Sequence, residues 1–269
     1  MDTSRRHLVK RTGAFVVGAS FAVGASFAGP LRASAQPAAP QAPPALPWPF
    51  KPLNLDAVGQ AGYEGFYKGG CMFGAFDSII GQLQQTVGYP YTTMPTTFAI
   101  YGEGGVAGIS TLCGCLNGAA AAIFVVAGGV ERERREAAYP MIRDMFNWYE
   151  QSELPDFRPA KPKFEIVKSV SKSPLCHASV TNWCKVANVK SFSPERAERC
   201  GWLSGSVARF AANLLNEKAK GGFKPAFGLS TATQTCRGCH DQGGVIENSR
   251  GMMDCGGCHF TPKTEHPKL

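Results

Sequence analysis

Two copies of the pattern Cys-x-x-Cys-His lie close together near the end of the 269-residue chain, at 236–240 and 255–259. In this pattern two thiols add to the vinyl groups of a porphyrin and the adjacent imidazole binds its iron, which is the chemistry of haem c attachment. A four-cysteine zinc ribbon also uses paired Cys-x-x-Cys units, but it needs no histidine directly after each pair. We therefore predict two haem c groups, with His240 and His259 as proximal iron ligands. The attachment residues are Cys236, Cys239, Cys255 and Cys258.

Two six-coordinate haems would need two further axial ligands, and two histidines remain for that role. Apart from His7, which lies in a predicted export signal, the chain holds only His177 and His266 outside the two motifs. We expect both to be distal iron ligands, His266 on the neighbouring haem or in a partner subunit because it follows its own motif so closely. The alternatives are a solvent-exposed His266 and a buried, hydrogen-bonded His177. Met252 and Met253 are alternative axial ligands that would raise the reduction potential.

Six cysteines lie outside the haem motifs, and three chemistries could use them. An even number in an exported protein favours three disulfides. Free thiols could instead act in redox chemistry, and four thiolates converging from different helices could hold an iron–sulfur cluster. A domain of this size does not need disulfides for stability, so the choice stays open. The residues are Cys71, Cys113, Cys115, Cys176, Cys184 and Cys200.

Residues 1–35 have the pattern of an export signal. Residues 4–10, SRRHLVK, resemble the bacterial twin-arginine motif. A mildly apolar stretch follows at 12–30, and the ASA sequence at 33–35 is typical of a cleavage site. Glycines in the apolar stretch argue against a retained anchor, and no other segment is apolar enough to span a bilayer. We therefore expect a soluble periplasmic protein with no membrane span in its mature chain.

The formal charge of +8 does not indicate a nucleic-acid partner. The signal accounts for half of it, since residues 1–35 hold five basic residues and one acidic residue. The propionates of two haems would bring the mature protein close to neutrality. We therefore expect no nucleic-acid binding.

The mature chain is expected to be mostly α-helical. A Pro- and Ala-rich linker at 36–56 precedes a helical cysteine-rich domain at 57–228, and a loop-rich dihaem segment follows at 229–269. Apolar periodicity and proline positions predict the main helices, at 57–86, 109–130, 140–151 and 194–218.

Local signals predict how several of these elements begin. Pro140 is expected in a first helical turn, and Ser173-Pro174 and Ser193-Pro194 are each expected to supply an N-cap and first residue. The charged run at 131–136 is expected to be a solvated face. The Gly-rich turn at 102–108 could suit a phosphate, but no βαβ unit follows, so nucleotide binding is not expected.

The segment at 113–118, CGCLNG, resembles the CGAxxG motif of a family of redox-active cysteine proteins, with Cys115 in place of the family's alanine. Cys71 fits the cysteine that this family carries upstream, and Cys176 and Cys200 fit its two downstream cysteines. The turn at 102–108 fits the family's Gly-rich turn, whereas Cys184 is an addition. The resemblance covers residues 60 to 215.

This domain followed by two Cys-x-x-Cys-His motifs is similar to the split-Soret cytochrome c family. The resemblance implies a helical domain with an iron–sulfur site, then a dihaem segment. It also implies a homodimer with the haems clustered at one end and an iron ligand supplied by the partner subunit. By resemblance, the cluster ligands are Cys71, Cys113, Cys176 and Cys200, with Cys115 as the main rival.

Filled axial positions predict outer-sphere electron transfer between redox partner proteins. One alternative is a reductase of a small sulfur or nitrogen species at the Cys113/Cys115 pair or at a cluster, and another is a redox sensor. The twin-arginine route exports folded proteins, so we expect residues 57–228 to fold around a cluster first. The segment at 229–269 would then receive haem after export.

Overall fold

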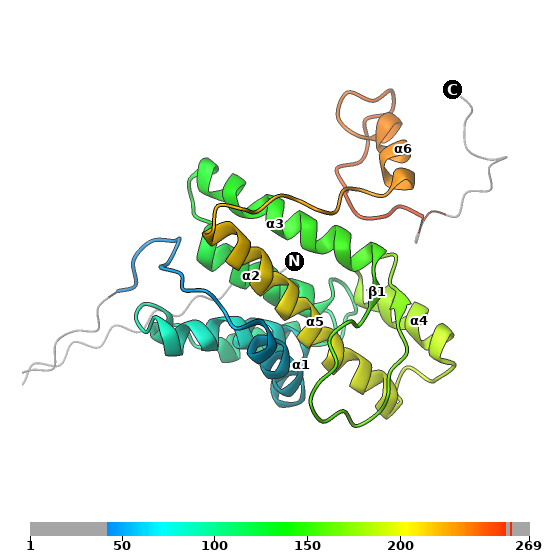
Figure 1. Cartoon of the computed structure of the whole chain (residues 1–269). Coiled ribbons are helices and arrows are strands. Elements are labelled where there is room, and N and C mark those ends of the chain that lie inside the picture. Colours follow the sequence, from blue (N-terminus) through cyan, green and yellow to red (C-terminus); the bar gives the residue numbers. More distant parts are fainter. Residues whose placement is uncertain (1–41, 257–258, 260–269) are drawn as a thin grey trace, which may run out of the picture. The chain divides into compact units, whose positions relative to one another are not determined.

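The computed structural model describes residues 42–256 and 259, which belong to one compact unit. The predicted export signal, the first part of the linker, Cys258 and His266 lie outside the described residues. The fold is mostly α-helical, as the sequence predicts (Figure 1). In the described part of the chain, no helix has the length and apolar character needed to cross a membrane.

The longest helix, α1 (Leu55–Thr86), forms the centre of the domain and packs mainly against α5 (Pro194–Ala219) and α2 (Gly114–Ala127). Asn54 caps α1 by accepting a hydrogen bond from the Ala57 N–H. The helix breaks at Gly69 and Gly70, where Gly70 has a φ of +80°. This is a left-handed value that a residue with a Cβ rarely adopts. The break turns Cys71 inward, where it is buried.

Part of the predicted linker packs onto the helices. Within residues 42–56, the side chains of Trp48 and Leu53 are buried. The backbone N–H of Trp48 donates to the Val125 carbonyl at 3.1 Å, and the indole ring packs edge-on against Tyr91, with 5.1 Å between the ring centroids. The described part of this Pro-rich segment therefore contributes to the core, unlike the extended linker that its composition predicts.

Two short 3-10 helices, η1 (Tyr91–Thr93) and η2 (Thr96–Gly102), lead into the Gly-rich turn. Helix α2 begins at Gly114, later than the predicted 109. Ser110 still has a left-handed φ of 66°, and Leu112 pairs with Leu175 in an antiparallel bridge. The backbone before Gly114 is therefore committed to the turn and the bridge, and not to a helix.

The expectation that Pro140 begins a helix is wrong, because it lies inside α3 (Arg132–Gln151). The predicted solvated run forms the first turns of α3 and is exposed, with an ion pair of 2.8 Å between Arg132 and Glu136. Proline lacks the N–H that a helix interior uses. Met141 and Trp148, among other buried side chains, hold α3 on the core on the C-terminal side of that position.

A small antiparallel pair joins α3 to α4 (Cys176–Ala187). Its strands are β1 (Glu153–Leu154) and β2 (Ser169–Val170), with Glu153 opposite Val170. Ser173 does not cap α4, contrary to expectation, and the N-cap position is Leu175. Carbonyls from the turn before α2 accept the first N–H groups of this helix instead. A nonlocal contact thus replaces the local cap.

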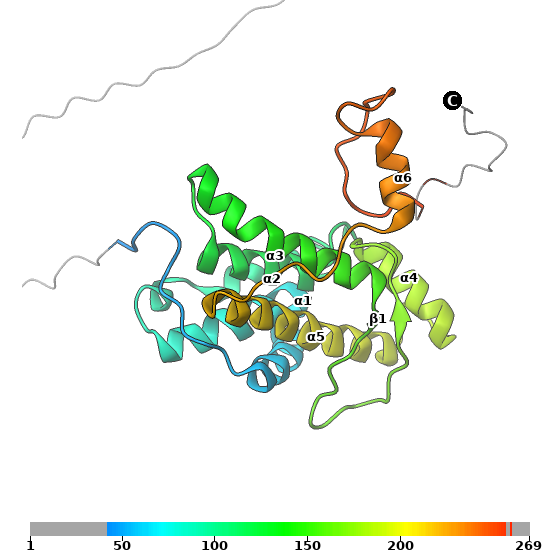
Figure 2. The same ribbon diagram turned by 45° about the horizontal axis from the view of Figure 1, so that its top comes forward.

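The Ser193-Pro194 prediction is confirmed. Ser193 caps α5 by accepting from the Arg196 N–H at 3.2 Å, and Pro194 is the first helical residue. The chain then runs along α3 and enters α6 (Thr231–His240), as Figures 1 and 2 show. The Asn147 side chain donates to the Phe227 carbonyl at 3.0 Å, and Gln151 donates to that of Gly228 at 2.8 Å. A ten-residue helix therefore stands where loops and short turns are predicted.

Candidate functional site

Five cysteines from four separate parts of the domain line one small interior cavity. The thiols of Cys113 and Cys115 lie 3.2 Å apart. Cys184, which the family resemblance sets apart as an addition, is not part of the lining. The structure therefore brings together every candidate cluster ligand named above, namely Cys71, Cys113, Cys115, Cys176 and Cys200.

A glycine allows the start of α2 to approach the broken α1. A Cβ on Gly114 would lie 2.4 Å from the Cys71 sulfur and 2.6 Å from the Gly102 carbonyl oxygen. Both distances are far inside van der Waals contact, so no larger residue fits without displacing the backbone. Gly114 thus sets how closely Cys71 and the Cys113/Cys115 pair approach each other.

The Gly-rich turn positions Cys176. The Cys176 N–H donates to the Thr111 carbonyl at 2.6 Å, and the Cys113 N–H donates to the Pro174 carbonyl at 2.9 Å. Gly105 has a φ of +72°, and a Cβ there would come within 2.9 Å of the Cys176 Cβ. The Gly-rich turn therefore packs against Cys176, and two backbone hydrogen bonds join the segment after the turn to the start of α4.

A buried arginine and two hydroxyl groups complete the lining and its surroundings. Arg199 is only 1% exposed, and its Nη2 donates to the Ser179 Oγ at 2.8 Å. The Tyr149 hydroxyl lies 2.7 Å from Ser179 Oγ and donates to the Cys113 sulfur at 3.3 Å. The Nε of Arg199 is buried without a hydrogen-bond partner.

The electrostatics of the cavity single out one thiolate. The hydrogen bond from Cys115 lowers the pKa of Cys113 to about 6, against the effect of burial, and Tyr149 and the charge of Arg199 lower it further. Burial raises the pKa of Cys176 to about 12. Burial also raises the pKa of Cys71, and the hydrogen bond to Cys113 raises that of Cys115. These effects favour Cys113 as the thiolate over Cys71, Cys115 and Cys176.

The donor set is suited to a soft metal centre. Thiolates favour zinc, copper(I) and iron–sulfur clusters. Every cysteine in the described part of the chain is free, so disulfides are absent from that part. Among those same residues, no three His, Cys, Asp or Glu side chains converge closely enough to hold a metal ion as they stand. The cavity collects the thiols without presenting a finished coordination geometry.

The first Cys-x-x-Cys-His motif lies on α6, with Cys236 exposed and Cys239 and His240 half-buried. The Nδ1 of His240 lies 2.8 Å from the Asn248 Oδ1, a contact that orients the imidazole. Burial raises the pKa of Cys255, and the neighbouring Cys236 thiol raises it further. The leading cysteines of the two motifs therefore lie close enough to interact.

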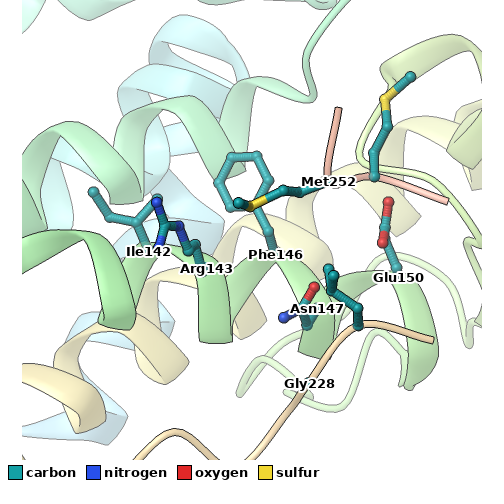
Figure 3. A pocket seen from close by; sticks show the side chains of 9 residues that line it. Ile142, Arg143, Phe146, Asn147, Glu150, Gly228 and Met252 are labelled. Atoms are coloured by element: carbon teal, nitrogen blue, oxygen red, sulfur yellow. The ribbon is translucent and has the colours of Figure 1, made fainter. Parts of the chain in front are cut away.

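An apolar cavity of about 370 Å³ separates α3 from the haem segment (Figure 3). In that view Met252 lies beside the Phe146 ring. The backbone N–H of Asp254 donates to the Glu150 carboxylate at 3.2 Å, and burial raises the pKa of Glu150 to about 7. The cavity is lined by Ile142, Arg143, Phe146, Asn147, Glu150, Gly228, Leu229, Met252 and Met253.

The candidate distal iron ligands lie in different parts of the chain. His177 is exposed in the first turn of α4, directly after Cys176, so it is not the buried histidine of the alternative reading. Met252 and Met253 line the α3 cavity. His266 lies outside the described residues.

The fold and the thiol cavity define a helical cysteine protein of a redox-active class. The family model described as "Putative redox-active protein (C_GCAxxG_C_C)" matches residues 74–214. In this family pattern the motif cysteine follows a glycine, as Cys115 follows Gly114, whereas the CGAxxG resemblance places the motif cysteine at Cys113. Leu116 replaces the alanine of the pattern and Ala119 its final glycine, and Cys71 lies just before the matched range.

The whole chain is similar to one curated protein. Split-Soret cytochrome c from Desulfovibrio desulfuricans is 35% identical over 271 residues, which cover 96% of this chain and 95% of that protein. The protein belongs to the split-Soret cytochrome c family. A solved structure reported as a novel iron centre in the Desulfovibrio desulfuricans split-Soret cytochrome c has a TM-score of 0.74 and 36% identity. The matched region covers 82% of this chain and 93% of the chain in the solved structure.

Sequence reasoning missed the polar residues that surround the sulfurs. Tyr149, Ser179 and Arg199 belong to no motif in the sequence. The only available signal was indirect, since Arg199 directly precedes a candidate cluster cysteine.

Proposed function

We propose that this protein is an electron-transfer cytochrome with two haem c groups on residues 229–269 and an iron–sulfur centre in the helical domain at 57–228. The observation that carries the proposal is the pairing of two attachment motifs, whose leading cysteines interact, with a separate cavity lined by five thiols. Family membership supports the same reading.

The haem-binding residues proposed from sequence fit the local geometry. Cys236 and Cys239 are one helical turn apart on α6, so their thiols lie on one side of the helix. The hydrogen bond between His240 Nδ1 and Asn248 favours Nε2 as the iron-binding nitrogen. Cys255, Cys258 and His259 would hold the second group in the same way. Bound haem would supply one-electron exchange at its iron.

The α3 cavity is suited to one edge of the second haem. Met253, in its wall, lies only two residues before the attachment residue Cys255. Apolar walls with few polar groups are typical of cofactor sites. Arg143 at the same cavity could pair with a propionate, since guanidinium groups bind carboxylates well.

Five thiols are available for the iron–sulfur centre, and they fit such a group. Their soft donor atoms suit iron, and the unpartnered Nε of Arg199 places positive charge at the same cavity. The choice of four ligands among the five thiols stays open. The candidates are Cys71, Cys113, Cys115, Cys176 and Cys200.

Assembly and ligation are proposed to involve two copies of the chain. An exposed imidazole at His177 could reach a haem of a partner subunit, and His266 is the other candidate distal ligand. Filled axial positions suit exchange of electrons with redox partner proteins. We expect neither nucleic-acid binding nor a membrane span in the mature chain.

Export is proposed to follow the twin-arginine route to the periplasm. Replacement of Arg5-Arg6 by Lys-Lys should abolish the haem-bearing periplasmic product. Normal export of that variant would contradict the proposed route.

One observation favours a second function. The 3.2 Å contact between Cys113 and Cys115, with a thiolate at Cys113, also suits reduction of a small sulfur or nitrogen species at these thiols. The two thiols would be oxidised to a disulfide in each cycle, so the assay supplies a chemical reductant. Turnover with that reductant, lost in Cys115→Ser but kept after haem loss, would support this alternative.

The deciding experiment is quantitation of haem, total iron and acid-labile sulfide on anaerobically purified protein. Two haems per chain with additional iron and sulfide are expected. The double variant Cys236→Ala/Cys239→Ala should lose one haem by intact mass and keep the sulfide. Cys184→Ala is the matched control, because Cys184 lies outside the cavity lining, and it should keep both haems and all the iron. Iron equal to haem, without sulfide, would remove the iron–sulfur centre.

A further inference from the structure

Arg199 is a buried cation without a carboxylate partner. Its side chain is 1% exposed, and no carboxylate of the described residues pairs with it. The adjacent Glu198 is committed elsewhere, since its carboxylate accepts hydrogen bonds from the Tyr63 and Tyr67 hydroxyls and from the Trp202 indole. The Lys163 backbone N–H donates to it as well, at 2.8 Å.

A buried guanidinium in this position needs a negative charge nearby. An unpaired charge in a protein interior is strongly destabilising. Arg199 lines the thiol cavity, and the titratable groups lining that cavity, besides Arg199 itself, are all cysteines. The counter-charge must therefore come from sulfur. Disulfide-bonded cysteines would carry no charge and would leave Arg199 uncompensated.

A directed chain of hydrogen bonds links Arg199 to one of those sulfurs. Arg199 donates to Ser179 Oγ, and the Tyr149 hydroxyl donates to Cys113 Sγ. Because Tyr149 has a single proton, Ser179 must be the donor in the 2.7 Å contact between the two hydroxyls. Each link therefore points its proton toward Cys113, which carries the positive polarisation of the guanidinium to the sulfur.

We infer that Arg199 is the counter-ion of the sulfur centre and that, with Ser179 and Tyr149, it is a positioning group that raises the centre's reduction potential. This inference rests on the proposed iron–sulfur centre. A fixed positive charge beside the centre makes addition of an electron more favourable. A guanidinium stays protonated even in a protein interior, so the side chain keeps its charge.

The test compares Arg199→Gln, Arg199→Lys and the control Arg196→Gln in anaerobically purified holoprotein. Arg196 lies on the same helix and donates to the Ser191 carbonyl, outside the cavity lining. Non-haem iron, sulfide and the midpoint potential of the centre are measured by a spectroscopically monitored redox titration. R199Q should lower the potential, the iron content or both, whereas R199K and R196Q should stay near the unaltered protein.

Equal iron content and equal potential in R199Q and R196Q would overturn the inference. If R199Q does not fold, Ser179→Ala serves in its place, since it breaks the hydrogen-bond chain and keeps the charge. S179A should lower the potential with full iron content, and an unchanged potential would refute the role of the chain.

Absence of non-haem iron from the unaltered protein would instead remove the iron–sulfur proposal. Arg199 is then tested by the rate at which Cys113 is alkylated in the folded protein. That rate should fall in R199Q and hold in R199K, and equal rates would overturn the counter-ion role.

Discussion

The hydroxyl of Tyr149 donates a hydrogen bond to the sulfur of Cys113 over 3.3 Å, from helix α3 to the first residue before α2. The two residues are 36 positions apart in the sequence. Tyr149 is fully buried, so the contact is shielded from water. It makes one thiol of the cavity chemically different from the others.

Tyr149→Phe should raise the pKa of Cys113 from its value of about 6. The substitution removes a hydrogen bond that stabilises the thiolate. A bond to a charged group contributes about 1.5–3 kcal/mol, which corresponds to a rise of about one to two pKa units. The pH dependence of Cys113 alkylation in iron-depleted, reduced protein measures it.

Tyr91→Phe is the control for this substitution. It removes a hydroxyl that is also buried but has no hydrogen-bond partner, so it should leave the Cys113 profile unchanged. An identical profile in Y149F and Y91F would show that the Tyr149 contact does not act on the thiolate.

Gly114→Ala should destabilise the domain and lower its content of the proposed iron–sulfur centre. The new methyl group would lie 2.4 Å from the Cys71 sulfur, so either α1 or α2 must move. Overpacking of this kind costs about 1–3 kcal/mol. Chemical denaturation and iron content measure the two effects, and haem content should not change.

The matched substitution for Gly114→Ala is Gly81→Ala. Its nearest neighbour is the Asp77 Oδ1 at 3.9 Å, in ordinary contact. Because Gly81 lies inside α1, alanine there should stabilise the helix by about 0.5–1 kcal/mol. Full iron content in G114A would contradict the packing argument.

Glu150→Gln should flatten the pH dependence of stability near neutrality. Burial raises the pKa of Glu150 to about 7 from 4.5, so the folded state holds its proton more tightly than the unfolded state. Its contribution to stability is complete below pH 4.5 and is lost as the pH rises to about 7. The size is on the order of 1–3 kcal/mol. Unfolding free energies measured at several pH values across that window test it.

Glu133→Gln controls for the loss of a carboxylate from α3, because Glu133 is exposed in the first turn. It should keep the slope of the unaltered protein. If E150Q also kept that slope, the buried Glu150 would not be the group that titrates.

Asn248→Ala should raise the midpoint potential of one of the two proposed haems and leave the potential of the other unchanged. The substitution removes the acceptor of the hydrogen bond from His240 Nδ1. That bond increases the basicity of the imidazole, which stabilises ferric iron. A redox titration should therefore resolve one shifted component, and two unshifted components would argue against Nε2 ligation by His240.

The success of the sequence predictions depended on whether the signal was local. The Ser193-Pro194 start of α5 is a local capping pattern, and it is confirmed. The Ser173-Pro174 pattern has the same form, but the first N–H groups of α4 donate to the carbonyls of Ser110 and Thr111. These carbonyls lie far away in the sequence, so the residues around Ser173 do not indicate them. Pro140 likewise lies inside a helix that buried side chains hold on the core.

The candidate site shows the same division. The resemblance to a cysteine family named the thiols that the cavity collects and set Cys184 apart as an addition, and the lining contains those five thiols without Cys184. Arg199 follows Glu198 inside the helix predicted at 194–218, and no motif marks either residue as buried. Their burial results from the packing of α5 against α1, so the sequence pattern of α5 alone could not reveal it.

The thiols of the cavity come from α1, the start of α2, the start of α4 and α5. Whatever group joins these sulfurs also joins segments that span residues 71 to 200, and so acts as a single cross-link for most of the domain. Loss of that group would release several helices at once. The lifetime of the protein against proteases would then follow the supply of iron and sulfide in the cell, so that abundance itself would report on cofactor assembly.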